Sequence, residues 1–316
     1  MHAATFFDGT GWREGVVQVV DGRVRLHHAA PPAGLPRLDG VVVGGFTDHH
    51  VHLQLVDGAQ LAGSRLGRVV DLGGNPETLR RLSARPVGID FAGAFLAPVG
   101  GYPSDRSWAP EGSVREIADP DSAAAAVAEM AAAGASCIKV TSNSTAGPVF
   151  ADELFRTIVG LSAAHALPVV AHAEGPGEAQ RVVRLGAARL AHAPFTERLD
   201  DDEITRQAAS ASWISTASIH GDPDREVVID NLRRFHTAGG TVLYGTDMGN
   251  GPTPVDLNPH EVAALREAGL DDAALLRALA PVDPLDPASA LLLVPGDPGS
   301  ADPLDARPLT PADLKV

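Results

Sequence analysis

Short apolar runs of strand length alternate with longer segments of helical periodicity along most of this chain. The strand candidates are residues 41–46, 68–72, 88–96, 136–140, 168–171, 188–191, 213–216 and 242–245. The segments that separate and follow them predict helices at residues 76–84, 122–133, 151–165, 177–185, 201–211, 224–238, 260–268 and 272–279. Such an alternation is typical of β–α units around a parallel sheet.

The number of these units favours one architecture. Eight strands within roughly 240 residues fit an α/β fold of the (β/α)8 TIM-barrel type. A doubly wound open sheet is the alternative that the pattern leaves open. The connection at residues 57–64 has no clear type.

The two ends of the chain have a different pattern. Residues 16–20 and 23–26 read as strands, and Asp21-Gly22 between them favours a tight hairpin turn. The tail after Val294 is rich in Pro, Asp and Gly, and we interpret it as a segment returning to these strands or as loosely held surface chain. We therefore predict a barrel of residues 39–289 and a small, reduced flanking β segment of residues 1–38 and 290–316.

Composition narrows the class of function. The 316 residues carry a net charge of −15, which argues against nucleic acid as a partner and disfavours anionic membrane surfaces. A single cysteine, Cys137, excludes an internal disulfide framework and is compatible with a reducing cytoplasm. The N-terminus has no secretory pattern. We expect a cytoplasmic enzyme with a small-molecule substrate, and leave a homo-oligomer open.

Candidate chemistry lies where the predicted strands end. His50 and His52 follow the first strand, and residues two apart in extended chain point to the same side, so both imidazoles can face one ion. The pair is a weak signal by itself, because chance gives roughly 0.45 His-x-His pairs in a chain with 12 histidines. Further polar groups end other apolar strands, namely Lys139, His172, His192 and Asp247. Burying such groups costs several kcal/mol unless they are paired or bind metal.

These motifs as a set resemble those of a known superfamily. The segment Gly45-Phe46-Thr47-Asp48-His49-His50-Val51-His52 is similar to the Gly-Phe-x-Asp-x-His-x-His signature of the metal-dependent amidohydrolases. The later lysine, histidines and Gly-Thr-Asp segment are similar to the imidazolonepropionase-like and Xaa-Pro-dipeptidase-like branch. The resemblance covers roughly residues 38–280.

The resemblance implies a binuclear metal centre. His50 and His52 would bind one ion together with Asp247, and His172 and His192 would bind the second. Lys139, carrying a carbamate formed from carbon dioxide, would bridge two divalent ions, with Zn²⁺ expected and Mn²⁺, Fe²⁺ or Co²⁺ as alternatives. Burial favours the neutral amine that must react with carbon dioxide.

The implied reaction is hydrolysis of a C–N bond in a small amide or cyclic amide. A hydroxide bridging the metals would attack the carbonyl, with Asp247 as general base and acid and Lys139 as the second catalytic residue. A phosphoester or lactone hydrolase, or a heterocycle deaminase, remains an alternative on the same ligands, and a non-catalytic scaffold would require gaps in the ligand set. Candidate substrate-binding residues in the loops after the strands are Gly101, Tyr102, Asn143 and His220.

Overall fold

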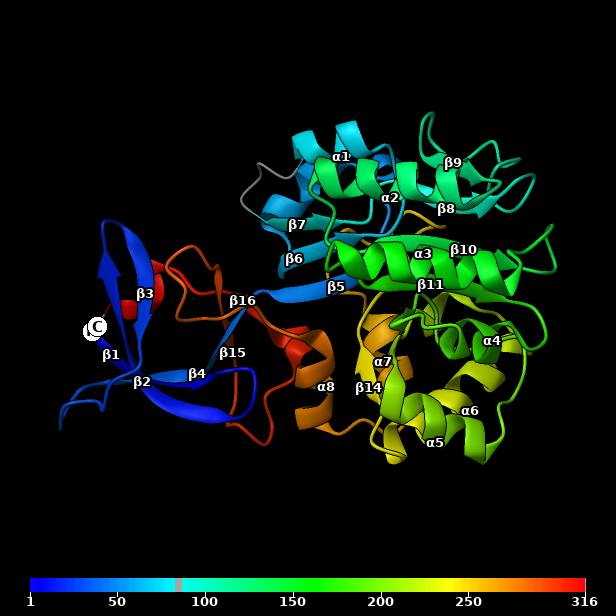
Figure 1. The fold of residues 1–316 in the computed structure, drawn as a ribbon. Coiled ribbons are helices and arrows are strands. Elements are labelled where there is room, and N and C mark those ends of the chain that lie inside the picture. Colours follow the sequence, from blue (N-terminus) through cyan, green and yellow to red (C-terminus); the bar gives the residue numbers. More distant parts are fainter. Residues whose placement is uncertain (83–86, 316) are drawn as a thin grey trace.

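A computed structural model describes residues 1–82 and 87–315, and in it the two ends of the chain meet in one six-stranded sheet (Figure 1). The strand order is β16-β15-β4-β1-β2-β3. Asp21 and Gly22 both have positive φ, as the predicted hairpin turn requires. The strands are β1 (His2–Phe7), β2 (Trp12–Val20), β3 (Arg23–His27), β4 (Arg37–Gly44), β15 (Leu291–Val294) and β16 (Arg307–Pro308). The tail therefore returns to the N-terminal strands, while the division at residues 38 and 290 stays a prediction.

Between these ends the chain forms two parallel sheets. The first has the order β5-β6-β7 and the second the order β14-β13-β12-β11-β10-β8-β9. Their strands are β5 (Phe46–Val51), β6 (Leu66–Asp71), β7 (Gly88–Phe91), β8 (Phe95–Pro98), β9 (Val114–Ile117), β10 (Ile138–Asn143), β11 (Val169–Glu174), β12 (Arg189–Leu190), β13 (Ser212–Ile214) and β14 (Thr241–Leu243). The predicted mixed α/β fold with parallel sheets is confirmed.

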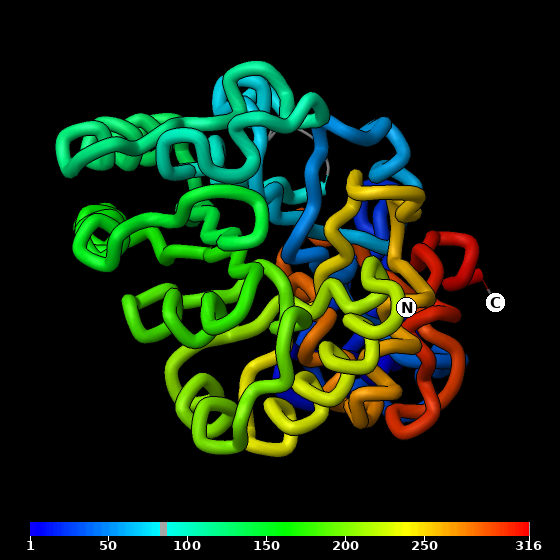
Figure 2. The backbone as a smooth tube through the Cα atoms, turned by 90° about the vertical axis from the view of Figure 1, so that its right-hand side faces the viewer, coloured from blue at the N-terminus to red at the C-terminus, as the bar shows by residue number. Residues whose placement is uncertain are grey.

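Main-chain hydrogen bonds join the two parallel sheets on two sides. On one side, Val51 and the residue Met248 beyond β14 form a parallel bridge, and His49 N donates to Tyr244 O at 3.0 Å. On the other side, Ser136 N donates to Phe91 O at 2.9 Å. Figure 2 shows the successive units following one another around the molecule, from cyan through green to yellow. The carboxyl ends of the strands are thus brought toward one region.

The helices lie outside the parallel strands, and Figure 1 shows α2 and α3 lying alongside β8, β10 and β11. Asp119 begins α2 with a reciprocal capping box, and Gly134 ends it in the left-handed conformation. None of the helices in the described part of the chain is long and apolar enough to cross a membrane. Their bounds are α1 (Pro76–Leu82), α2 (Pro120–Ala133), α3 (Asp152–Ala164), α4 (Glu178–Arg184), α5 (Asp201–Ser210), α6 (Asp224–Thr237), α7 (Pro259–Glu267) and α8 (Asp272–Leu279). Each agrees with its prediction within a few residues, and predicted helical residues 83–84 lie outside the described residues.

Two predicted strands are each divided by a glycine. The run at 41–46 ends one strand, β4, and begins another, β5, because the chain changes sheets at Gly45. A Cβ at Gly45 would come within 2.5 Å of the backbone nitrogen of Gly67, so this close approach of two strands requires glycine. The run at 88–96 is divided at Gly93, whose φ of 79° ends β7 before β8 begins. A short strand at 114–117, β9, was not predicted.

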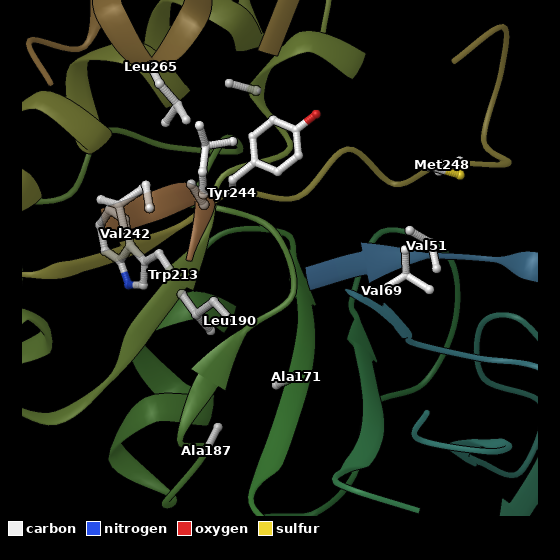
Figure 3. Close-up of a cluster of buried hydrophobic side chains, with 14 of the residues drawn as sticks. Val51, Val69, Ala171, Ala187, Leu190, Trp213, Val242, Tyr244, Met248 and Leu265 are labelled. Carbon is white, nitrogen blue, oxygen red and sulfur yellow. The ribbon is translucent and has the colours of Figure 1, made fainter. Parts of the chain in front are cut away.

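The core between strands and helices is built mainly from aliphatic side chains, with a few large aromatic ones (Figure 3). Trp213 is fully buried and stacks on Phe235 with ring centroids 3.8 Å apart. Its indole Nε1 donates to Gln207 Oε1 at 2.9 Å, so the polar atom of this side chain is satisfied. Truncating such a residue to Ala costs about 3–5 kcal/mol.

Candidate metal centre

His50, His52 and Asp247 form a compact buried cluster. Both imidazoles place Nε2 at 3.1 Å from the same carboxylate atom, Asp247 Oδ1. The ligand atoms of the three side chains all lie within 4.8 Å of one another, which fits a single divalent ion. His50 lies in β5, His52 follows its last residue, and Asp247 follows β14. The two imidazoles thus face the same carboxylate oxygen.

The other ring nitrogen of each histidine is held by a main-chain carbonyl. His50 Nδ1 donates to Ala191 O at 2.8 Å, and His52 Nδ1 donates to Gly73 O at 3.1 Å. A carbonyl oxygen can only accept, so these bonds place the proton on Nδ1 and leave the Nε2 lone pair facing the cluster. This is the tautomer that a metal ligand needs.

Asp48 ties the strand of the histidines to the segment of Asp247. Its side chain is completely buried, and its Oδ1 accepts from His50 N at 3.0 Å and from Thr246 N at 3.1 Å. Its Oδ2 accepts from Thr246 Oγ1 at 2.6 Å. Burial raises the pKa of this carboxyl to about 7. Asp48 therefore fixes the relative position of two ligand-bearing segments without facing the cavity described below.

His172 and His192 lie beside this cluster. Their ring centroids are 4.9 Å apart, and the His192 ring is 4.7 Å from that of His50. His192 Nδ1 is 2.9 Å from Thr216 Oγ1, and His172 Nε2 is 3.1 Å from Glu174 Oε2. One nitrogen of each ring is thus engaged, and the other, Nε2 of His192 and Nδ1 of His172, remains for a ligand.

Lys139 lies in β10 among these histidines. Its side chain is 1% exposed, and its Nζ is 3.5 Å from His50 Nε2. Burial lowers the pKa of Lys139 to about 8, against an opposing attraction from Asp247. A substantial fraction of neutral amine is therefore present near neutral pH, and the neutral amine is the form that adds to carbon dioxide.

The electrostatics of the cluster favour a cation. Burial alone would raise the pKa of Asp247, but His50 and His52 hold it well below its usual range, so the carboxylate is ionised. Burial lowers the pKa of His50 and of His192 well below the usual value, so both imidazoles are neutral. Burial alone would lower the pKa of His52, but its bond to Asp247 raises it, so this imidazole would release a proton when a cation binds.

A cavity of about 820 Å³ opens over the cluster. All six predicted ligands line it, as do Tyr102 and His220 of the predicted substrate-binding set. Gly101 and Asn143 are not among the described residues that line it. The N–H of Gly101 donates to Pro98 O at 2.8 Å, and the Asn143 amide donates to Glu174 Oε2 at 2.7 Å. The amide of Asn143 thus contacts the carboxylate beside His172.

Sequence reasoning did not assign roles to four residues that shape the site: Asp48, Glu174, Thr216 and Trp108. Asp48 belongs to the motif that carried the resemblance, so its motif position was the available signal. Glu174 follows His172 by two residues on β11, and period-two alternation could have placed both on one side. Nothing local distinguishes Thr216 or Trp108, because their contacts join segments far apart in the sequence.

No protein-family model and no curated protein matches this sequence. Solved structures do match it over nearly the whole chain, and they include several amidohydrolases and prolidases. The chain therefore has the fold of the amidohydrolase structures, and the resemblance drawn from the motifs is confirmed at the level of the fold.

Three of these structures show the extent of the likeness. A Xaa-Pro dipeptidase with bound methionine in its active site has a TM-score of 0.70 at 18% identity, over 94% of this chain and 94% of that chain. Ochratoxinase of A. niger has a TM-score of 0.72 at 16% identity, over 94% and 89% of the two chains. Phenylurea hydrolase B has a TM-score of 0.70 at 16% identity, over 94% and 92%.

Proposed function

We propose that this chain is a metal-dependent hydrolase that cleaves a C–N bond in a small amide or cyclic amide. The observation that carries the proposal is the convergence of six buried side chains at one end of the parallel strands: His50, His52, Lys139, His172, His192 and Asp247. The similar structures named as a dipeptidase, an ochratoxinase and a phenylurea hydrolase support this class of reaction. We also infer that the adjoining parallel sheets form a (β/α)8 barrel, whose site lies at the carboxyl ends of its strands.

The donor set fits two divalent cations. His50, His52 and Asp247 would hold one, and His172 with His192 would hold the other. A carbamate on Lys139 would supply the anionic oxygen donors shared by both, since an ammonium group cannot ligate a cation. Mixed nitrogen and oxygen ligation fits Zn²⁺ and also Mn²⁺, Fe²⁺ or Co²⁺. Two such ions would supply Lewis-acid activation of a carbonyl oxygen and lower the pKa of a bound water.

Asp247 is the group we assign to proton transfer. Its Oδ1 faces the two imidazoles, and its Oδ2 accepts from Asn250 Nδ2 at 2.8 Å, so the carboxylate is fixed on both sides. An ionised carboxylate in this position accepts a proton from the attacking water and delivers it to the leaving nitrogen. Asp247 lines the cavity, so a substrate carbonyl bound there would lie within reach of it.

The composition of the chain makes a direct test available. Lys139 and Lys315 are its only lysines, and Lys315 is exposed. Carbon-13 bicarbonate should therefore give one carbamate NMR resonance in the metal-loaded protein. Lys139→Ala should remove that resonance and lower the metal content from two ions per chain to one or none, while the matched control Lys315→Ala should change neither.

Activity is measured on a panel of N-acyl amino acids, dipeptides, hydantoins, anilides and lactones. Lys139→Ala should lose at least about 100-fold in rate on any substrate found, in line with the loss of an essential metal bridge. Small carboxylates should restore part of that rate. A purified protein that binds no transition metal, or a Lys139→Ala variant with full metal content and activity, would refute the binuclear proposal.

A further inference from the structure

We propose that the substrate of this site is an uncharged aromatic amide, with its ring held against Trp108 and no free carboxylate on the molecule. The inference rests on the proposed function, because it assumes that the scissile carbonyl faces the metal cluster. It follows from the charges and rings that line the cavity above that cluster.

The cavity wall offers no cation to pair with a substrate carboxylate. Among the described residues that line it, none is arginine, and the single lysine is Lys139 at the metal cluster. The guanidinium of Arg106 lies 5.7 Å from the centroid of the Tyr102 ring, but Arg106 is not a lining residue. The wall instead carries the carboxyl group of Glu174, whose Oε2 is 3.1 Å from His172 Nε2. A carboxylate-bearing substrate would lose hydration here and gain no partner.

Aromatic rings form one side of the cavity. The Trp108 ring lies 6.2 Å from Phe95, 6.1 Å from Tyr102 and 6.5 Å from His52, and all three are edge-on or tilted. No stacked partner of Trp108 occurs among the described residues, so a face of the indole is free. Tyr102, in contrast, already stacks on His172 at 5.1 Å. Trp108 is therefore the lining ring best placed to stack on a flat apolar group.

A second pair of rings lines the cavity as well. His220 stacks on Phe195 with ring centroids 4.1 Å apart, and burial lowers the pKa of His220 to about 4. Its Nε2 is buried and has no hydrogen-bond partner among the described residues. A neutral imidazole can supply one hydrogen bond to an amide without requiring a charge on the substrate.

The entrance is apolar too. Leu55 and Trp108 line the cavity and are 36% and 39% exposed. Large exposed apolar side chains around a pocket are typical of a site for apolar ligands. These exposed side chains and the two groups of rings that line the cavity thus favour the same kind of ligand, an uncharged aromatic one.

Hydroxamates test the inference because they chelate divalent metals and can carry different side groups. Binding to the metal-loaded full chain is measured by titration calorimetry with acetohydroxamate, benzohydroxamate, 4-carboxybenzohydroxamate and its neutral isostere 4-carbamoylbenzohydroxamate. Benzohydroxamate should bind about tenfold more tightly than acetohydroxamate. The carboxylate should weaken binding at least about tenfold relative to the carbamoyl isostere.

Two variants test whether Trp108 is the residue that binds the aromatic ring of benzohydroxamate. Trp108→Ala should remove most of the tenfold advantage of benzohydroxamate and leave acetohydroxamate binding unchanged, whereas the control Val99→Ala should alter neither. Equal binding of aceto- and benzohydroxamate, or a carboxylate probe that binds as tightly as its isostere, would overturn the inference while the metal site stands. Failure of acetohydroxamate itself to bind would overturn the proposed function, and the inference with it.

Discussion

Asp48 should be the residue outside the ligand set whose loss damages the protein most. Asp48→Ala removes the acceptor of three buried hydrogen bonds, from His50 N, Thr246 N and Thr246 Oγ1. Each donor left unsatisfied in the interior costs about 1–3 kcal/mol. The summed loss in unfolding free energy is therefore about 3–9 kcal/mol, a large part of the roughly 5–15 kcal/mol that stabilises a typical domain.

Asp48→Asn is the matched control. Both main-chain donors bond the same oxygen, Oδ1, which an asparagine retains. Its amide group would replace Oδ2, and the Thr246 hydroxyl can turn to accept from it. We therefore expect this variant to lose only about 1 kcal/mol, since no buried donor is left unpaired.

The assay has two readouts. Equilibrium urea unfolding gives the difference in free energy, and titration against a competing chelator gives the metal affinity. Asp48→Ala should lower that affinity about 10–100-fold, since it releases the segments that carry His50 and Asp247. An Asp48→Ala variant within about 1 kcal/mol of the parent, or an asparagine variant as damaged as the alanine one, would show that these bonds do not position the site.

Three further outcomes are expected. Asp247→Asn should keep the fold and most of the metal but lose at least about 100-fold in turnover; parent-like rates on the best panel substrate would contradict its role in proton transfer. Thr216→Val should weaken metal binding about tenfold, because it removes the hydroxyl partner of His192 Nδ1. Thr216→Ser keeps that hydroxyl and should bind metal like the parent. Titration against a competing chelator measures both affinities. Burial raises the pKa of Cys137 to about 11, so a thiol reagent at pH 8 should label the native chain at least about 1000-fold more slowly than the urea-unfolded chain. Labelling within tenfold of the unfolded rate would mean that this strand opens readily.

The sequence was most informative where local pattern and tertiary structure agree. Helix α8 lies at Asp272–Leu279 as predicted, because an N-cap aspartate and an apolar stripe mark it locally. The six candidate ligands were identified because each is a polar group within or just after a predicted apolar strand, where packing alone gives no reason for one. Parallel strands then bring such residues together at one edge, even though they lie far apart in the chain.

Other features could not be predicted, since they depend on contacts between distant segments. The division at Gly93 follows from the approach of Met130, whose Sδ a Cβ there would strike. Thr216 adopts a left-handed φ of 42°, unusual for a β-branched residue, so that its backbone N–H donates to Gly245 O and its hydroxyl reaches His192. Neither the contact at Gly93 nor the conformation of Thr216 alters the pattern of apolar and polar residues from which elements are predicted.

The pairing of β15 with β4 has a consequence for biosynthesis. Leu291–Val294 align antiparallel with Val41–Gly44, and Gly45 alone separates that strand from the one that carries His50. A chain made from its N-terminus exposes this edge of β4 until residue 294 has left the ribosome. This edge of β4 should therefore be open to misassociation while the protein is being synthesised.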